Sequence, residues 1–271
     1  AAGTLAFELL DALLLASLPR LGLSFGRLGP ALLGFTAGRV VLGLAIAWTW
    51  RVGSYFCPQA LSRRGAQALL LLCGLVNLGL LGAAIDSLYI EPFRLQISQV
   101  QLTVPFSRPG RPLRILHLTD LHLERLTRRE RRVLEAVQSL QPDLIALTGD
   151  YLNLDYLYDP LARQQARDFL AQLQAPYGVY AVRGTVDGDG IFEALFEGLD
   201  IVLLEDRLVS LSMETGQVSL LGVANWDLDR DRQALEKLAV QTPQGSYSIL
   251  LYHTPDLVEA AARAGIDLYL A

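Results

Sequence analysis

The chain has 271 residues, of which 52% are hydrophobic and only 19% are charged, and its formal net charge is −5. Intrinsic disorder is excluded, because a disordered chain combines low hydrophobicity with high charge. Residues 1–90 hold six basic and three acidic residues, whereas residues 91–271 hold 17 basic and 25 acidic residues. The acidic second part argues against a nucleic-acid partner, since binding phosphates requires a basic face. Cys57 and Cys73 are too few for a disulfide framework.

Three apolar segments in residues 1–90 predict transmembrane helices. Residues 66–85 are twenty residues without a charge, and crossing a bilayer takes about 20 apolar residues. Residues 31–50 are a second candidate, because their eight Leu, Ile, Val and Phe side chains roughly offset the insertion cost of one central Arg. Residues 3–18 are a third candidate, although they carry two acidic residues. We therefore expect two or three membrane-spanning helices at the start of the chain.

The charges in this region indicate how it is held in the membrane. Arg39 lies in the middle of the second segment, and Glu8 or Asp11 of a neighbouring helix is the expected partner for it. The loop 51–65 has three Arg and no acidic residue, which favours a cytoplasmic loop by the positive-inside rule. We therefore expect a multi-pass membrane protein whose second part, residues 91–271, lies outside the cytoplasm.

Residues 91–271 alternate short apolar runs with amphipathic segments, which predicts alternating strands and helices. We expect strands at 95–104, 113–118, 143–147, 178–182, 201–204, 208–211, 218–223, 247–252 and 266–270. We expect helices at 127–140, 160–173, 191–199, 229–238 and 255–264. This alternation is typical of a layered α/β fold, in which ligands bind at the carboxyl ends of strands.

Asp and His side chains gather at the predicted carboxyl ends of four strands. In chain order these residues are Asp120 and His122, Asp150, Asp187, and His253. Carboxylate and imidazole groups are suitable ligands for divalent transition metals, and one Asp can bridge two such ions. A lone Asp-x-His is more often a helix cap or a structural histidine, and a lone Gly-Asp is more often a turn. Four such strand ends together favour a metal site over these alternatives.

Two further signals favour structural roles. Asp227, Asp229 and Asp231 resemble the start of a calcium-binding loop, but position six is Arg232 and not Gly, and position twelve is not Glu. An acidic helix start is the better interpretation, because carboxylates are favourable near a helix N-terminus. His117 lies inside a predicted strand and is expected to be a structural histidine.

The order and spacing of the motifs resemble a known family. The segments ILHLTDLH (115–122), LIALTGD (144–150), YGVYAVRG (177–184) and ILLYHTPD (249–256) are similar to the motifs of calcineurin-like metallophosphoesterases. Together with IEPFRLQISQVQLTVP (90–105) and the apolar helices before it, they resemble the bacterial, membrane-anchored type. The resemblance covers about residues 88–271 and implies a metallophosphoesterase-like β-sandwich flanked by helices in residues 91–271.

The resemblance implies a site for two divalent metal ions, of Mn, Fe or Zn. By position, Asp120 and His122 would hold the first ion. Asp150 would bridge both ions, and His253 would bind the second. A metal-bound hydroxide would then attack the phosphorus of a phosphate ester or pyrophosphate. The implied protein is a phosphoesterase anchored in the bacterial cytoplasmic membrane, which acts on a phosphorylated small molecule or a lipid-linked substrate.

One motif departs from the family pattern. Where members have Gly-Asn-His-Asp, this chain has Gly184-Thr185-Val186-Asp187. In the family the Asn is a metal ligand and the His contacts substrate, so Thr185 is a poor substitute and Val186 cannot replace the His. Asp187 or Asp189 is a candidate replacement ligand. Loss of a catalytic acid alone lowers reaction rates by about 10²–10⁴-fold.

Two other features bear on activity. Asn153 stands where many members have a second Asp after Gly-Asp. The sequence ends at Ala271, where the family has Gly-His-x-His, and we therefore expect a phosphoesterase domain that is incomplete at its C-terminus. Two alternatives to an enzyme stay open. One is a degenerate relative that binds or senses a ligand without efficient catalysis, and the other is a membrane scaffold without metal.

Overall fold

The computed structural model describes residues 2–17, 28–56, 63–104, 111–214 and 216–271. The chain divides into two compact units, Ala1–Gln96 and Ile97–Ala271. We call the first the helical unit and the second the sandwich unit.

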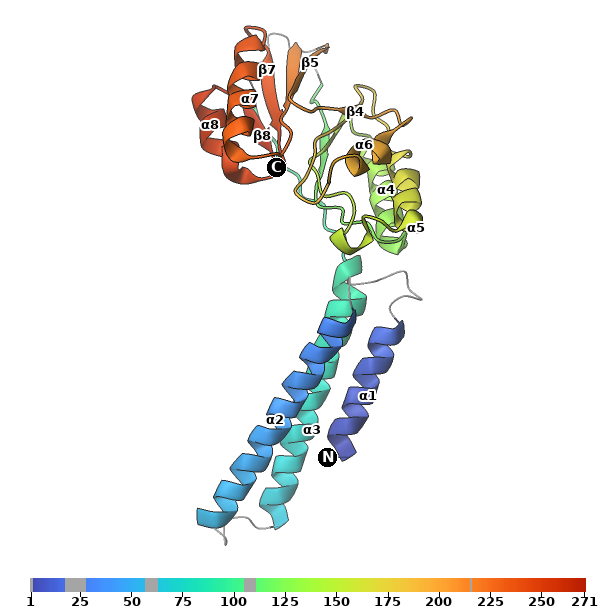
Figure 1. The fold of residues 1–271 in the computed structure, drawn as a ribbon, viewed down its shortest axis with the longest axis vertical. Coiled ribbons are helices and arrows are strands. Elements are labelled where there is room, and N and C mark those ends of the chain that lie inside the picture. Colours follow the sequence, from blue (N-terminus) through green and yellow to red (C-terminus); the bar gives the residue numbers. More distant parts are fainter. Residues whose placement is uncertain (1, 18–27, 57–62, 105–110, 215) are drawn as a thin grey trace. The chain divides into compact units, whose positions relative to one another are not determined.

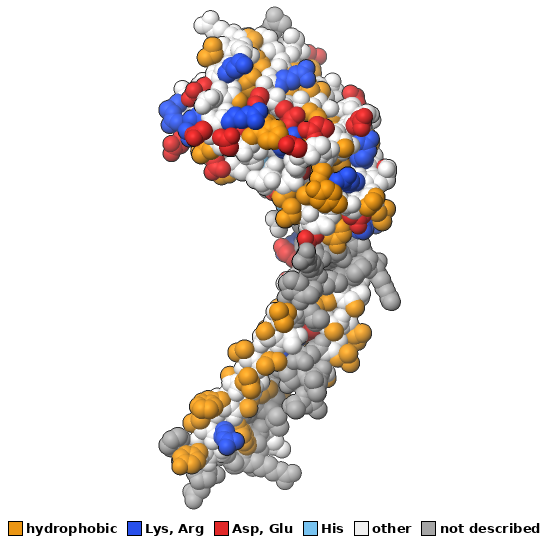
Figure 2. Space-filling model, in the orientation of Figure 1, with side chains coloured by type: hydrophobic (Ala, Val, Ile, Leu, Met, Phe, Trp, Pro, Cys, Tyr) orange, Lys and Arg blue, Asp and Glu red, His pale blue; other side chains and the backbone are white. Residues whose placement is uncertain are grey.

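The described part of the helical unit consists of apolar helices (Figure 1). They are α1 (Ala2–Ser17), α2 (Leu28–Phe56) and α3 (Arg63–Ile85), and short helical turns follow at Asp86–Ile90 and Glu91–Phe93. Figure 2 shows hydrophobic side chains along this unit, with few charged ones on the face drawn. The three segments predicted as apolar helices are thus confirmed as helices.

Fewer of these helices than predicted have the length and composition of a membrane span. Among the described residues, only Leu33–Tyr55 in α2 is long and apolar enough to cross a membrane, and Leu71–Ile85 in α3 is a shorter apolar helix. One of the predicted spans therefore has the length and composition of a membrane helix, and the others stay predictions.

The buried side chain of Arg39 links the three helices. Arg39 of α2 donates hydrogen bonds from Nε and Nη2 to the two carboxylate oxygens of Asp11 in α1, at 2.5 and 2.9 Å. Its Nη1 donates to the side-chain oxygen of Asn77 in α3 at 2.7 Å. Arg39 and Asp11 are each 2% exposed, so each charge needs the other in its apolar surroundings. The predicted pairing of Arg39 with an acidic residue of a neighbouring helix is confirmed for Asp11.

The described part of the sandwich unit contains two four-stranded sheets. The first has the order β1-β2-β3-β4 and is parallel throughout, with β1 (Ile115–Leu118), β2 (Leu144–Leu147), β3 (Val179–Ala181) and β4 (Val202–Leu203). The second has the order β5-β6-β7-β8, with β5 (Arg207–Ser212), β6 (Gln217–Gly222), β7 (Tyr247–Leu251) and β8 (Leu268–Leu270). Only the β5–β6 pair is antiparallel. Eight of the nine predicted strands are therefore confirmed.

Helices cover the outer face of each sheet. The first sheet carries α4 (Arg128–Leu140), α5 (Pro160–Leu170) and α6 (Ile191–Phe196), and the second carries α7 (Leu228–Gln241) and α8 (Val258–Arg263). Between the sheets, Leu144 and Val182 pack with Leu220 and Ile249. Strand β2 is buried on both faces, which explains its unbroken run of apolar residues. The predicted β-sandwich flanked by helices is confirmed.

Local signals account for where two of these helices begin. The hydroxyl of Thr127 accepts a hydrogen bond from the N–H of Arg129, and the carboxylate of Glu130 accepts one from the N–H of Thr127. This reciprocal pattern is a capping box, and it starts α4. The carboxylate of Asp227 accepts a hydrogen bond from the N–H of Arg230 and caps α7. The acidic run that resembles a calcium-binding loop is therefore a helix start, as predicted.

The prediction of a strand at residues 95–104 is wrong. Residues 95–104 alternate polar and apolar residues, but they form no strand with any described segment. Ile97, Val100 and Leu102 are 52, 82 and 54% exposed. The alternation supplies the side chains of a strand, but a strand also needs a hydrogen-bonded neighbour. The predicted helix at 255–264 also differs in detail, because a 3₁₀ turn precedes α8.

Candidate metal centre

Backbone hydrogen bonds join the loops that follow β1 and β2. The N–H of Asp120 donates to the carbonyl of Gly149 at 3.2 Å, and the N–H of His122 donates to the carbonyl of Asp150 at 2.9 Å. Because β1 and β2 are parallel neighbours, both loops leave the sheet at the same edge. The fold thus brings Asp120, His122 and Asp150 together there.

The same three residues have an uncommon backbone conformation. The dihedral φ is +51° at Asp120, +40° at His122 and +55° at Asp150. Residues other than glycine rarely adopt positive φ, and where they do they cluster at functional sites whose surroundings hold them in place. Among the described non-glycine residues, only Gln141 and Asp206 share this feature. Backbone strain is therefore concentrated at the predicted metal ligands.

Four side chains present oxygen and nitrogen atoms to one small volume. Ligand atoms of Asp120, Asp150 and His253 all lie within 4.8 Å of one another. Nε2 of His122 lies 3.7 Å from a carboxylate oxygen of Asp120 and 3.7 Å from one of Asp150. Two carboxylates and two imidazoles fit the ligand preference of divalent transition metals. The four predicted ligands thus lie together, and their binding of a metal stays a prediction.

The cluster is buried on one side and open on the other. The side chains of Asp150 and His253 are 7 and 8% exposed, whereas those of Asp120 and His122 are 52 and 41% exposed. A ligand therefore reaches the cluster from the side of Asp120 and His122.

A carbonyl group orients His253. Its Nδ1 lies 2.7 Å from the carbonyl oxygen of Thr148, and its Nε2 faces Asp150 at 3.4 Å. Histidines that bind metals usually donate the other ring N–H to such a group, which fixes the tautomer. The hydroxyl of Thr148 lies 2.7 Å from Nε2 of His117. His117 thus has a structural hydrogen bond in its strand, in agreement with its predicted role.

In the metal-free protein, Asp150 and His253 form an ion pair. Burial opposes ionisation of Asp150, but hydrogen bonds from His253 and from the backbone N–H of Val186 outweigh it and lower the pKa of this carboxyl group to about 2. The hydrogen bond to Asp150 raises the pKa of His253 to about 8, although burial acts in the opposite direction. At neutral pH, His253 therefore carries a proton that a metal ion must displace.

We expect the affinity for Mn²⁺ to rise as pH increases towards about 8. Only the neutral imidazole of His253 is a ligand, so the cation competes with its proton below a pKa of about 8. Asp150, with a pKa of about 2, is ionised across this pH range, so its titration does not change the affinity for Mn²⁺ there. Isothermal titration calorimetry at several pH values below and above the pKa of His253 measures the effect.

The stability of the metal-free protein should change in the opposite direction. The ion pair between Asp150 and His253 stabilises the folded protein fully below the pKa that histidine has in the unfolded chain. This stabilisation is lost as pH rises through about 8, the pKa of His253 in the folded protein. A His253→Ala variant is the control, and it should flatten both pH dependences. Mn²⁺ affinity that does not vary with pH in the unaltered chain would contradict the assignment of His253 as a ligand.

Thr185 lies at the cluster, at the position of the family's Asn. Its hydroxyl donates towards the carboxylate of Asp150, at 3.2 and 3.3 Å from the two oxygens, and it lies 3.5 Å from Nε2 of His253. Val186 donates its backbone N–H to Asp150 at 3.0 Å. Thr185 therefore contributes a short hydroxyl at the expected ligand position, and the apolar side chain of Val186 contributes no polar group.

Asp187 and Asp189 have other partners. The carboxylate of Asp187 is buried and accepts hydrogen bonds from three backbone N–H groups, those of Asp150, Tyr151 and Gly184. It thereby ties the loop after β3 to the loop after β2. Asp189 pairs with Arg183 at 2.6 Å. Both carboxylates thus have other partners, and the replacement of the missing ligand by one of them stays a prediction.

Sequence reasoning missed the close approach of two glycines. A Cβ on Gly184 would lie 2.2 Å from the backbone nitrogen of Asp150, and one on Gly149 would lie 2.5 Å from Cα of Gly184. A glycine soon after each of two neighbouring strands was the available signal. Asn153 lies outside the cluster, since its side chain donates to Glu124 at 2.7 Å and caps the turn that follows.

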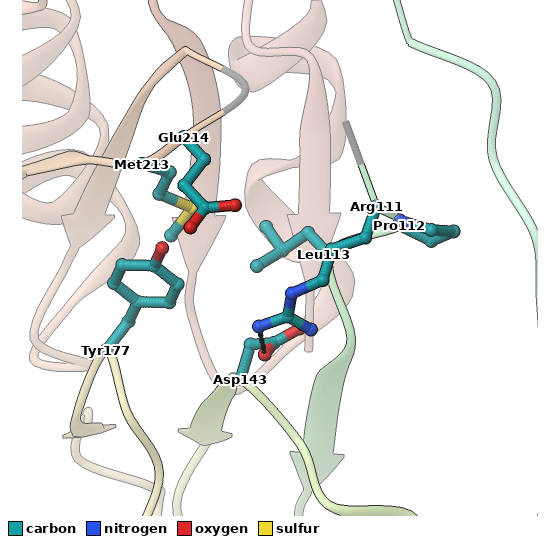
Figure 3. Close-up of a pocket in the computed structure, with 7 residues that line it drawn as sticks. All are labelled: Arg111, Pro112, Leu113, Asp143, Tyr177, Met213 and Glu214. Atoms are coloured by element: carbon teal, nitrogen blue, oxygen red, sulfur yellow. Dashed lines mark hydrogen bonds and ion pairs between the residues drawn. The ribbon is translucent and has the colours of Figure 1, made fainter. Parts of the chain in front are cut away.

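A small cavity lies at the opposite edge of the sheets (Figure 3). It is lined by Arg111, Pro112, Leu113, Asp143, Tyr177, Met213 and Glu214. Arg111, Asp143 and Tyr177 precede β1, β2 and β3, so this edge carries the amino ends of the strands. Arg111 and Asp143 form an ion pair at 2.6 Å. The volume of about 20 Å³ accommodates about one water molecule, so the cavity is too small for a phosphate ester.

The sandwich unit is a helix-flanked α/β fold whose strand ends carry Asp and His side chains, the residue types that suit divalent transition metals. The family model described as Calcineurin-like phosphoesterase matches residues 113–265, more than half of the chain. The chain belongs to this family, which confirms the resemblance inferred from its motifs. Membership supports hydrolysis of phosphate esters as the class of activity, and members generally use a dinuclear metal site.

Bacterial relatives are similar over part of their length. The uncharacterized metallophosphoesterase YkoQ of Bacillus subtilis is 30% identical over 153 residues, which are 54% of this chain and 54% of that protein. The UDP-2,3-diacylglucosamine pyrophosphatase LpxG of Chlamydia trachomatis is 30% identical over 102 residues, which are 36% of this chain and 30% of that protein. The LpxG of Chlamydia muridarum is 29% identical over the same shares. The matches thus span about half of YkoQ and about a third of LpxG.

Proposed function

We propose that this protein is a membrane-anchored, metal-dependent phosphoesterase. The observation that carries the proposal is the convergence of two Asp and two His side chains at one edge of the sandwich, with ligand atoms of three of them within 4.8 Å. Family membership adds the class of reaction. Together they favour hydrolysis of a phosphate ester or pyrophosphate bond.

The proposal gives each side chain of the cluster a task. Asp120 and His122, on the exposed side of the cluster, would hold one divalent cation. His253 would hold a second cation, and Asp150 would bind both. The bound cations, of Mn, Fe or Zn, would polarise the phosphoryl group and neutralise its negative charge. The hydroxyl of Thr185 fixes the carboxylate of Asp150 by its hydrogen bonds.

Electrostatic repulsion favours binding of the cations before binding of the anionic substrate. The cluster contains two carboxylates, and residues 91–271 carry eight more acidic than basic residues. An anionic phosphate is repelled by such a surface unless cations neutralise it first. The substrate then enters from the exposed side, where Asp120 and His122 lie.

The helical unit supports a membrane anchor and a lipid-linked substrate. Leu33–Tyr55 has the length and composition of a membrane helix. The pairing of Arg39 in α2 with Asp11 in α1 lets both charges be buried between these helices in an apolar medium. The similar LpxG proteins are, by their name, pyrophosphatases of a diacylated sugar nucleotide. Within the broader class of phosphorylated small molecules, we therefore favour a lipid-linked phosphate or pyrophosphate.

The proposed location is the bacterial cytoplasmic membrane, with two or three spans. Residues 51–65, which include the end of α2 and the start of α3, have three Arg and no acidic residue, which favours their placement on the cytoplasmic side. With 66–85 as the next span, the sandwich unit lies on the extracytoplasmic side.

Hydrolysis of bis(p-nitrophenyl) phosphate by the full chain in detergent tests the proposed activity. We expect a rate that requires added Mn²⁺ and is lost in the Asp120→Ala/His122→Ala double variant, because this variant lacks the ligands of one cation. Asp200→Ala removes an exposed acidic residue outside the cluster and should leave the rate unchanged. A rate for the unaltered chain no higher than that of the double variant would contradict the proposed function.

A second candidate is a degenerate family member that binds or senses a phosphorylated ligand. Thr185 and Val186 favour it, because neither side chain supplies the groups that the family has at these positions. This candidate predicts Mn²⁺ binding in calorimetry without measurable turnover. Mn²⁺ binding together with Mn²⁺-dependent turnover would exclude it.

A further inference from the structure

The segment from Asp150 into the first turn of α5 exposes a group of apolar side chains. Leu154, Tyr158 and Leu161 are 62, 81 and 51% exposed, and we call these three the Leu154–Leu161 surface. Figure 2 shows hydrophobic side chains gathered at the end of the sandwich unit where α5 lies in Figure 1. Exposed apolar side chains that gather on one surface mark an interaction site.

Arginine side chains lie against the tyrosine rings of this segment. The guanidinium of Arg125 lies 5.3 Å from the ring centre of Tyr156 and pairs with Asp159 at 2.8 Å. The guanidinium of Arg163 lies 5.5 Å from the ring centre of Tyr158. Tyrosine rings and arginines with apolar stems are the side chains that suit the boundary between lipid headgroups and acyl chains.

The Leu154–Leu161 surface adjoins the most basic stretch of the sandwich unit. Residues 124–132 hold five Arg and two Glu, and Glu130 is buried in the capping box of α4. The rest of residues 91–271 holds 12 basic and 23 acidic residues. The N–H of Leu126 donates to the side chain of Gln165 in α5 at 2.7 Å, so this stretch packs beside α5.

We propose that the Leu154–Leu161 surface and the stretch 124–132 contact the headgroup region of an anionic membrane. The apolar side chains enter the interface, and the arginines bind lipid phosphates. Charge complementarity favours this occupant, because the arginine-rich stretch 124–132, beside exposed apolar side chains on an otherwise acidic unit, matches a negatively charged bilayer.

This contact would bring lipid headgroups to the candidate metal cluster. Leu154 follows Asp150 by four residues. The backbone of Leu152 pairs with that of Leu123, the residue after His122, in an isolated β-bridge. The inference deepens the proposed function, and it rests on that function for its catalytic meaning. The membrane contact itself can be measured without any turnover.

A fluorescent label on the full chain in liposomes tests the contact. Cys57 and Cys73 are first replaced by Ala, and a Tyr158→Cys or Leu161→Cys variant is labelled with a nitrobenzoxadiazole group. The vesicles contain phosphatidylglycerol, with or without brominated acyl chains. We expect the brominated lipid to quench the label at both positions. The matched control is Val240→Cys on α7, a side chain that is 89% exposed, where iodide and not lipid should quench.

Each outcome has a defined meaning. Replacing phosphatidylglycerol with phosphatidylcholine should lower the lipid quenching at both positions, because the arginines lose their anionic partner. Iodide quenching equal to that of the control, without lipid quenching, would overturn the proposal. Protection from iodide without lipid quenching would also overturn it, and would indicate a protein partner. Lipid quenching in a chain without turnover would contradict the proposed function alone. Circular dichroism checks that each variant is folded.

Discussion

The Thr185→Asn/Val186→His double variant should hydrolyse phosphodiesters about 10²–10⁴-fold faster than the unaltered chain, which is the usual contribution of a general acid. The hydroxyl of Thr185 already lies 3.2 Å from Asp150 and 3.5 Å from Nε2 of His253. An Asn side chain at this position is longer, and its amide oxygen could act as a metal ligand in the space beside Asp150 and His253. Val186 is held beside Asp150 through its backbone N–H, so a histidine there adds the acid that the family uses for the leaving group.

The single variants separate the two contributions. Thr185→Asn alone should raise Mn²⁺ affinity with a smaller gain in rate, and Val186→His alone should raise the rate without a change in Mn²⁺ affinity. The double variant in a His253→Ala background should show no gain, because one cation then lacks a ligand. A double variant that binds Mn²⁺ as tightly as the unaltered chain, without a faster rate, would show that the remaining cluster does not support catalysis.

The location of the site could be predicted because its ligands follow strands that the sequence marks clearly. The unbroken apolar run Leu144–Leu147 predicts a strand buried on both faces, and β2 is such a strand. A polar residue directly after such a run must lie at the edge of the sheet, and parallel neighbours share this edge. The convergence of Asp120 and Asp150 follows from this argument without any knowledge of distances. His253 follows β7 of the second sheet, so its approach to them depends on how the two sheets pack.

Other features depended on partners that are distant in the sequence. Residues 95–104 have the alternation of a strand, but whether a strand forms depends on a neighbour that the segment itself does not specify. Asp187 and Asp189 were equivalent as spare carboxylates in the sequence. Only the fold shows that one accepts three backbone N–H groups and that the other pairs with Arg183. The capping box of Thr127 needed no such partner, and its prediction was correct.

Replacing Gly184 with Ala should abolish Mn²⁺ binding and hydrolysis together. The added Cβ would lie 2.2 Å from the backbone nitrogen of Asp150 and 2.2 Å from its Oδ1. Neither loop can absorb this contact without a shift of backbone, and overpacking of this kind typically costs about 1–3 kcal/mol. A displacement of about 1 Å at a reacting group already lowers rates by roughly 10²-fold. Asp150 is the proposed bridge between two cations, so its displacement affects both.

Gly188→Ala is the matched control, because Gly188 lies in the same loop and a Cβ there meets nothing within 4 Å. Calorimetry with Mn²⁺, the hydrolysis assay and thermal unfolding should show no change for this control. For Gly184→Ala we expect a lower unfolding midpoint and no Mn²⁺ binding. If Gly184→Ala binds Mn²⁺ as tightly as the unaltered chain, Asp150 is not a ligand, because its carboxylate cannot keep its place beside an added Cβ. The close approach of the two loops is therefore the feature on which the proposed metal centre depends most directly.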